Sequence, residues 1–265
     1  MAVGSLSMAA PAGAAELKPG TIAAFERYQR AAESAIEADV STSDRFLRGF
    51  RGDAAERRET DNKLRQGQVV VERLQAADGG RHIDVPDGLI HHWIGTVFVP
   101  GIHVDAAVSL MQDYDRHSQF FRPNVVRSKT LEHDGDRYRL FLRFFFKKVI
   151  SVTVNTESIA LFTRHDADRV SSTIRSTRIA EVENPGATNE KELPVGRDSG
   201  YLWRLNTYWR FVERDGGTYI ECESLTLTRG IPLGFGWLIG PFVTSIPRET
   251  LTMTLEATRR TLLTK

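Results

Sequence analysis

Asp113, Asp115 and His117 are the first candidates for chemistry in this chain of 265 residues. Carboxylates and imidazoles are common metal ligands, so a spacing of two residues suggests a cation site. On a helix, however, residues two apart point in different directions, and no fourth ligand follows nearby. We therefore interpret these three residues as solvated charges at the junction between two short helices.

The other reactive side chains form no recognised catalytic motif. His91 and His92 are adjacent in a segment typical of a strand, so they point to opposite faces and cannot chelate one ion together. Cys222 is the only cysteine, which excludes an internal disulfide and a thiolate metal cage, and we interpret it as a small, half-buried core residue. HExxH, CxxC, phosphate-loop and GxSxG motifs are absent. The sequence predicts no catalytic residue, no metal and no cofactor.

A second set of side chains predicts a site for an apolar ligand. Alternate residues from Tyr201 onward combine indole, aliphatic and hydroxyl side chains on one face. A two-residue turn at Asp215-Gly216 or at Gly216-Gly217 returns the chain, so that hydroxyl-bearing residues of the next strand share this face and Arg210 lies opposite Glu221 or Glu223 on the outer face. The predicted ligand contacts are Trp203, Leu205, Thr207, Trp209, Ser224, Thr226 and Phe144 on strands, with Phe242 and Ile246 in the C-terminal segment.

Two alternatives stay open for this face. A buried hydroxyl without a partner costs roughly 1–3 kcal/mol, so either groups of the sheet or a ligand must satisfy these side chains. Arg175 has two interpretations as well. If it points inward it anchors the carboxylate or phosphate head group of a ligand, and otherwise it is an exposed arginine of the sheet.

The elements that must position these side chains follow from hydrophobic periodicity. Apolar residues at helical spacing from Ile22 to Ile36 predict a helix near the N-terminus. Short helices are expected at residues 105–113 and 117–121, and a C-terminal helix that begins at Pro247, after an apolar segment at 236–245. Strands are expected at residues 68–75, 90–99, 125–132, 138–148, 150–163, 169–183, 202–214 and 218–229.

This order of elements resembles the START-like helix-grip superfamily, also called SRPBCC, which includes lipid-transfer START domains, birch-pollen-allergen-like proteins and polyketide cyclases. The resemblance is carried by residues 96–100 (TVFVP), 110–115 (LMQDYD) and 121–126 (FRPNVV), and by the hairpin and tail from Tyr201 onward. It implies an α+β fold in which a curved antiparallel sheet of about six to seven strands wraps a long C-terminal helix. It also implies an internal cavity that binds or transfers a hydrophobic small molecule or lipid. The alternatives are a cyclase- or aromatase-like enzyme using the same cavity, and a structural or interaction protein whose cavity is filled.

Composition limits the partners. Lys and Arg number 35 against 34 Asp and Glu, so the net charge of +1 supplies no overall field for nucleic acid. No segment of the sequence is long and apolar enough to be a transmembrane helix, although transient membrane contact is compatible with lipid transfer.

The chain is expected to divide into three parts. Residues 1–20 form a disordered leader or the end of an export signal, residues 21–88 a helical extension with one strand, and residues 89–265 the helix-grip domain. An export signal would place the protein in the periplasm, and its absence would place it in the cytoplasm.

Overall fold

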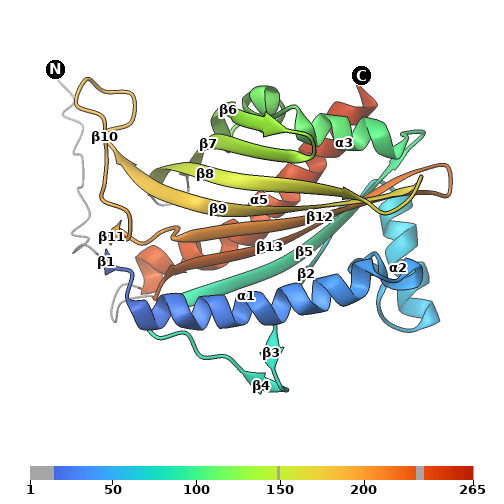
Figure 1. Cartoon of the computed structure of the whole chain (residues 1–265), viewed down its shortest axis with the longest axis horizontal. Coiled ribbons are helices and arrows are strands. Elements are labelled where there is room, and N and C mark those ends of the chain that lie inside the picture. The colour runs from blue at the N-terminus through green and yellow to red at the C-terminus, as the bar shows by residue number, and fades with distance from the viewer. Residues whose placement is uncertain (1–14, 148–149, 231–235, 265) are drawn as a thin grey trace.

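A curved antiparallel sheet of nine strands dominates the structure (Figure 1). The computed structural model describes residues 15–147, 150–230 and 236–264, and for residues 236–244 it describes the backbone alone. The sheet has the strand order β2-β5-β13-β12-β9-β8-β7-β6, with β10 beside β9. Its strands are β2 Val70–Arg73, β5 Gly88–Pro100, β6 Val125–Asp134, β7 Arg137–Lys147, β8 Ser151–Arg164, β9 Arg169–Glu183, β10 Lys191–Glu192, β12 Arg204–Arg214 and β13 Gly217–Arg229.

Helices and two small strand pairs complete the fold. The helices are α1 Pro19–Val40, α2 Ala54–Arg65, α3 Val104–Gln112, α4 His117–Phe120 and α5 Gly236–Leu263. The pairs are β1 Ala15–Glu16 with β11 Arg197–Asp198, and β3 Ala77–Asp78 with β4 Arg81–His82. Within the described residues, no helix is both long and apolar enough to span a bilayer.

The turn between β12 and β13 sets the register of the central hairpin. Arg214 pairs with Gly217, so the loop consists of Asp215 and Gly216, which have φ angles of 58° and 76°. Positive φ at both positions is the geometry of a tight hairpin turn, which glycine adopts without steric cost. The pairing of odd residues with even residues is therefore confirmed, and Arg210 lies opposite Glu221 as predicted.

Helix α5 packs against the concave face of the sheet, where Leu251 and Leu255 join the main core. Gly95 of β5 permits this approach, because a β carbon at that position would lie 2.6 Å from Leu255 Cδ1. The prediction that a new helix starts at Pro247 is wrong. α5 continues through it from Gly236 to Leu263, although a proline removes one backbone hydrogen bond.

Helix α1 covers the opposite, convex face of β5, β13 and β12 (Figure 1). Phe25 and Tyr28 of α1 pack there with Tyr208, Leu225 and Leu227 of the sheet. Both faces of these central strands are consequently buried. The helix-grip α+β fold is confirmed, with more strands than the six to seven predicted.

The N-terminal leader was expected to extend to residue 20. Residues 1–14 lie outside the described part of the chain, but β1 pairs with β11, and Leu17 N donates a hydrogen bond to Gly196 O over 2.8 Å. Helix α1 then begins at Pro19. Residues 15–20 are thus part of the folded structure.

Candidate functional site

An apolar cavity of about 160 Å³ lies between the concave face of the sheet and α5. Of the residues predicted from the sequence to contact a ligand, the structure places Leu205, Thr207, Trp209, Ser224, Thr226, Phe144 and Ile246 in its wall. They come from β7, β12, β13 and α5, because alternate residues of each strand point toward the same side. The side chain of Phe242 lies outside the described part of the structure.

Trp203 does not line the cavity, contrary to the prediction. It precedes the first residue of β12, so the alternation of that strand does not extend to it. Its indole packs with Phe25 and Leu227 on the convex side, and its Nε1 donates to Asp198 Oδ1 over 3.0 Å.

Arg175 does not enter the cavity either. It pairs with Asn206 and Ile159 on the convex face, while the neighbouring Ile174 lines the cavity. The Arg175 guanidinium donates to Glu33 Oε1 of α1 over 2.7 Å. The inward head-group anchor is therefore wrong, and Arg175 is a half-exposed arginine that ties the sheet to α1.

One end of the cavity is formed by the segment between α3 and β6, which the sequence analysis did not include in the site. Met111, Tyr114, His117 and Phe121 line the cavity there. The His117 ring lies 4.7 Å from that of Tyr114 and 4.9 Å from that of Phe121, between ring centroids. The interpretation of His117 as a solvated charge is wrong, because the side chain is buried. The apolar Leu110-Met111 pair shortly before it is the only local signal of burial, and the charges of Asp113 and Asp115 obscure that signal.

The described residues of the cavity wall include no lysine, arginine, aspartate or glutamate. His117 is neutral at physiological pH, because burial lowers its pKa to about 4, and its Nε2 donates to Met111 O over 3.0 Å. Burial raises the pKa of the Cys222 thiol. No group of His, Cys, Asp and Glu side chains among the described residues could hold a metal ion. The described part of the wall is therefore uncharged as well as apolar.

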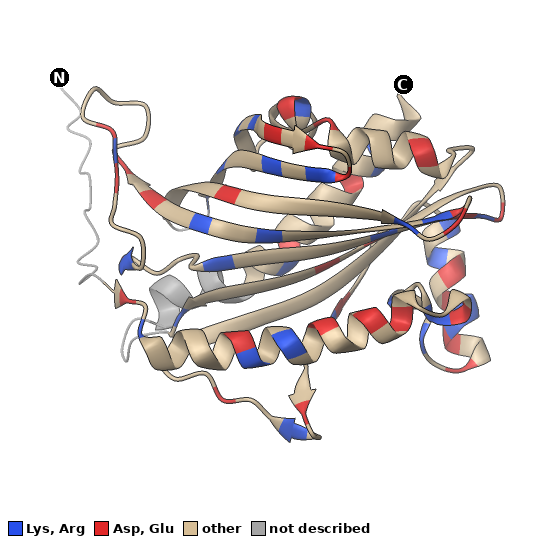
Figure 2. Ribbon diagram, viewed as in Figure 1, with Lys and Arg blue, Asp and Glu red and all other residues tan. Residues whose placement is uncertain are grey.

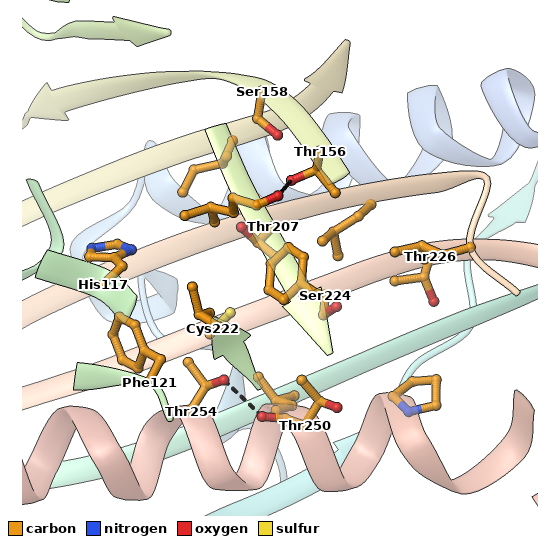
Figure 3. A pocket seen from close by; sticks show the side chains of 18 of the residues that line it. His117, Phe121, Thr156, Ser158, Thr207, Cys222, Ser224, Thr226, Thr250 and Thr254 are labelled. Atoms are coloured by element: carbon orange, nitrogen blue, oxygen red, sulfur yellow. Dashed lines mark hydrogen bonds between the residues drawn. The ribbon is translucent and has the colours of Figure 1, made fainter. Parts of the chain in front are cut away.

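The hydroxyls of the wall fall into two groups (Figure 3). Thr156 donates to Leu142 O over 3.1 Å, and Thr254 to Thr250 O over 2.8 Å. Thr226 Oγ1 is buried and has no hydrogen-bond partner among the described residues. Partners in the protein thus satisfy some of these hydroxyls and leave others unpaired.

At the opposite end from His117, Tyr201 and Leu202 line the cavity as part of the connection between β9 and β12. Glu181 of β9 holds this connection, since its Oε2 accepts a hydrogen bond from Ser199 N over 2.8 Å. Burial, reinforced by the charge of Asp198, raises the pKa of Glu181 to about 7. Asp198 accepts hydrogen bonds from Gly200 N and Trp203 Nε1. Two carboxyls therefore position the segment that closes this end.

The convex face contains a buried ionic network. Arg210 donates to Glu221 Oε1 over 2.7 Å and to Glu223 Oε2 over 2.9 Å, and these three side chains are at most 1% exposed. Glu223 also contacts His92 and Arg48. Burial alone would raise the pKa of Glu223, but the hydrogen bond from His92 and the charges of its neighbours outweigh it and lower the pKa to about 2. His91 instead contacts Thr228 on the concave side, so the two histidines do point to opposite faces.

No protein-family model matches this sequence, and no curated protein is significantly similar to it. In structure the chain is similar to the Zhui aromatase/cyclase from Streptomyces sp. R1128, with 14% identity and a TM-score of 0.47, over 66% of this chain and 94% of that one. It is similar to a STAR-related lipid transfer protein from Xanthomonas axonopodis, with 18% identity and a TM-score of 0.42, over 73% and 98% of the two chains. For human STARD10 the identity is 10% and the TM-score 0.45, over 78% and 80%.

The described elements form a curved antiparallel sheet around a C-terminal helix, with two short helices after the first long strand, which is the helix-grip arrangement that the sequence predicted. The predicted fold is thereby confirmed. Identities of 10% to 18% transfer no ligand and no activity to this chain.

Proposed function

We propose that this protein binds or transfers an uncharged hydrophobic molecule in the cavity between the sheet and α5. The observation that carries the proposal is the cavity itself, whose described wall is apolar apart from uncharged hydroxyl, imidazole and thiol groups. Moving an apolar molecule from water into such a site stabilises the complex in proportion to the apolar area buried. Concave, mostly apolar pockets with few polar groups are typical of small-molecule binding.

The size of the cavity limits the part of a ligand that it encloses. A cavity of roughly 150 Å³ lined by apolar side chains is enough to hold benzene. The volume of about 160 Å³ therefore accommodates a compact ring system or the end of a longer chain. A longer lipid would require displacement of the residues at one end, such as Tyr201 and Leu202.

The wall gives less support to a cyclase-like enzyme. Acid–base catalysis needs a group that changes protonation near the operating pH. Among the described wall residues, His117 has a pKa of about 4, and burial raises the pKa of Tyr114 beyond its usual range. Glu181, with its pKa of about 7, lies on β9, where it holds the connection at the Tyr201 end, and is outside the described wall.

The test uses the neutral fluorescent amine 1-aminoanthracene as a probe. We expect saturable binding with enhanced emission, and an increase in the melting temperature of the protein, because a ligand that binds only the folded state stabilises it. Leu205→Trp, which places a larger side chain in the cavity, is expected to weaken binding at least tenfold. Leu161→Trp is the matched control, since Leu161 is 50% exposed on the convex face of β8.

Mass spectrometry of an organic extract from the purified protein identifies any molecule retained during purification. The proposal is overturned if the probe does not bind, if Leu205→Trp binds it as well as the unaltered protein does, or if Leu161→Trp weakens binding equally.

A further inference from the structure

Thr207 and Ser224 place two hydroxyls at one position in the cavity wall. They are directly opposite each other on β12 and β13, and both line the cavity (Figure 3). The β carbons of such a cross-strand pair lie roughly 5 Å apart, so one ligand atom can contact both side chains.

The exposed surface of these two residues faces the cavity. β12 is flanked by β9 and β13, and β13 is flanked by β12 and β5, so neither residue lies at a sheet edge. Both side chains are nevertheless partly exposed, unlike their buried neighbours Asn206 and Leu225 on the convex face. The space available to them is therefore the interior of the cavity.

The hydrogens of these hydroxyls are available to a ligand. Thr207 Oγ1 accepts a hydrogen bond from Trp209 Nε1 over 3.3 Å, and within the described residues neither Thr207 nor Ser224 donates to a protein acceptor. Thr156 and Thr254, which line the same cavity, donate to backbone carbonyls instead. Thr207 and Ser224 thus keep hydroxyl hydrogens that a ligand can use, as do Tyr114 and Thr226 of the wall, whose buried hydroxyls have no partner in the described structure.

The charge of the wall restricts what these donors can bind. A carboxylate or phosphate placed in the cavity would lose its hydration, and the described wall contains no cation to compensate it. A neutral acceptor loses much less hydration free energy than an anion does when it leaves water, and it can accept hydrogen bonds from both hydroxyls.

From this arrangement we propose that Thr207 and Ser224 form a polar subsite for an uncharged hydrogen-bond acceptor, such as the carbonyl oxygen of a ketone or ester, on an otherwise apolar ligand. This inference rests on the proposed binding function, because it specifies the chemistry of a ligand in that cavity. The two hydroxyls fix the position of the carbonyl, and the apolar wall holds the rest of the molecule.

Three naphthalene probes of similar shape separate the two proposals. The first is 2-acetylnaphthalene, which carries a carbonyl oxygen. The second is 2-isopropylnaphthalene, in which a methyl group replaces that oxygen, and the third is 2-naphthoate, which carries a charge. Displacement of 1-aminoanthracene gives a dissociation constant for each. We expect the ketone to bind about 3- to 10-fold more tightly than the hydrocarbon, because one net hydrogen bond changes the dissociation constant by about that factor. The carboxylate is expected to bind most weakly.

Ser224→Ala removes a hydroxyl that has no protein partner in the described structure, so the fold should be retained. This variant is expected to bind the hydrocarbon unchanged and to lose most of the preference for the ketone. Ser172→Ala is the matched control. Ser172 pairs with Trp209 on the same face, and its buried Oγ also lacks a partner, but it does not line the cavity. It should keep the preference.

Thr207→Val is the second variant and should also reduce the preference, although it leaves Trp209 Nε1 without its acceptor. Failure of all three probes to bind would overturn the proposed function. Binding of the hydrocarbon as tightly as the ketone, or an unchanged preference in both Ser224→Ala and Thr207→Val, would overturn the subsite and leave the proposed function intact. Tightest binding of 2-naphthoate would also overturn the subsite as a site for uncharged acceptors.

Discussion

At the scale of single residues, β13 separates two kinds of chemistry by alternation. Cys222, Ser224 and Thr226 line the cavity, while Glu221 and Glu223 on the other face accept hydrogen bonds from Arg210. Since successive side chains of a strand point to opposite faces, charges and an apolar cavity occupy one strand without meeting. Glu221 and Glu223 are directed to the convex side and therefore stay outside the described cavity wall.

The buried network leads to a prediction about Arg210. Arg210→Met retains the length of the side chain but leaves Glu221 and Glu223 adjacent, buried and without their common cation. Breaking a buried ion pair by removal of one partner costs about 3–5 kcal/mol, so we expect a decrease of that size in the free energy of unfolding. Urea denaturation followed by circular dichroism measures it.

Arg137→Met serves as the control, because Arg137 is exposed on β7 and should change stability by less than about 0.5 kcal/mol. Equal stability of the two variants would mean that the network does not contribute to folding in the way that its burial indicates.

At the scale of elements, the connection between β9 and β12 depends on Glu181. Its carboxyl faces Asp198, Tyr201 and Arg229, and its pKa is about 7 in the folded state, against an ordinary value of 4.5 for a glutamate in water. Below pH 4.5 the carboxyl is protonated in both the folded and the unfolded state. As pH rises toward 7, the unfolded state ionises first, so the folded state is progressively destabilised, with the full effect above pH 7.

Glu181→Gln removes this titration and retains an oxygen that can accept the hydrogen bond from Ser199 N. We expect the melting temperature of this variant minus that of the unaltered protein to be larger at about pH 8 than at about pH 5. For a chain of about this length, each kcal/mol of unfolding free energy corresponds to a shift of about 2–4 °C in melting temperature.

Glu183→Gln on the same strand is the control, since Glu183 is exposed and pairs with Lys191. A melting-temperature difference for Glu181→Gln that is the same at both pH values would contradict the assignment.

The positions of strands and turns were more predictable from the sequence than the face of each strand that points into the cavity. The expected range for β9, residues 169–183, matches the structure, and the Asp215-Gly216 turn follows from local chemistry, because glycine relieves the steric cost of positive φ. Which face points inward depends on packing with distant segments. Arg175 lies on the convex face because α1 supplies Glu33 there, and no local pattern reveals this partner.

A register shift illustrates the same limit. Strict alternation along β9 would place Arg175 and Arg178 on opposite faces, yet Arg175 pairs with Ile159 and Arg178 with Glu157, both on the convex face. The irregularity between Glu157 and Ser158 inserts an additional residue in β9, which reverses the alternation beyond it. The Tyr114–His117 end of the cavity was missed because its short helices come together only through tertiary packing.

At the scale of the whole molecule, α1 and the segment that follows it cover the convex side of the sheet. α1 packs on Tyr208, Leu225 and Leu227, and the backbone N–H groups of Arg48 and Gly49 donate to Glu221 over 3.0 and 2.7 Å. Positive and negative side chains are interspersed along α1 and across the sheet (Figure 2), so no single-sign surface dominates this view. The extension therefore contributes apolar contacts and specific partners for buried charges rather than a long-range field.

Removal of residues 1–66, which contain α1 and α2, should consequently prevent folding. A chain of residues 67–265 retains every strand of the main sheet but exposes the apolar convex face and leaves Glu221 without its backbone donors. We expect it to show no cooperative thermal transition.

Because a truncated chain can aggregate for other reasons, Phe25→Ala in the full chain tests quantitatively how much α1 contributes to stability. Phe25 is 1% exposed, and its truncation should lower the free energy of unfolding by about 3–5 kcal/mol, as measured by urea denaturation. Exposed Arg27→Ala on the same helix should have little effect. If residues 67–265 unfold cooperatively at a melting temperature close to that of the full chain, α1 is not required for folding. The sheet would then pack around α5 without the contacts that residues 1–66 make to the ionic network on the convex face.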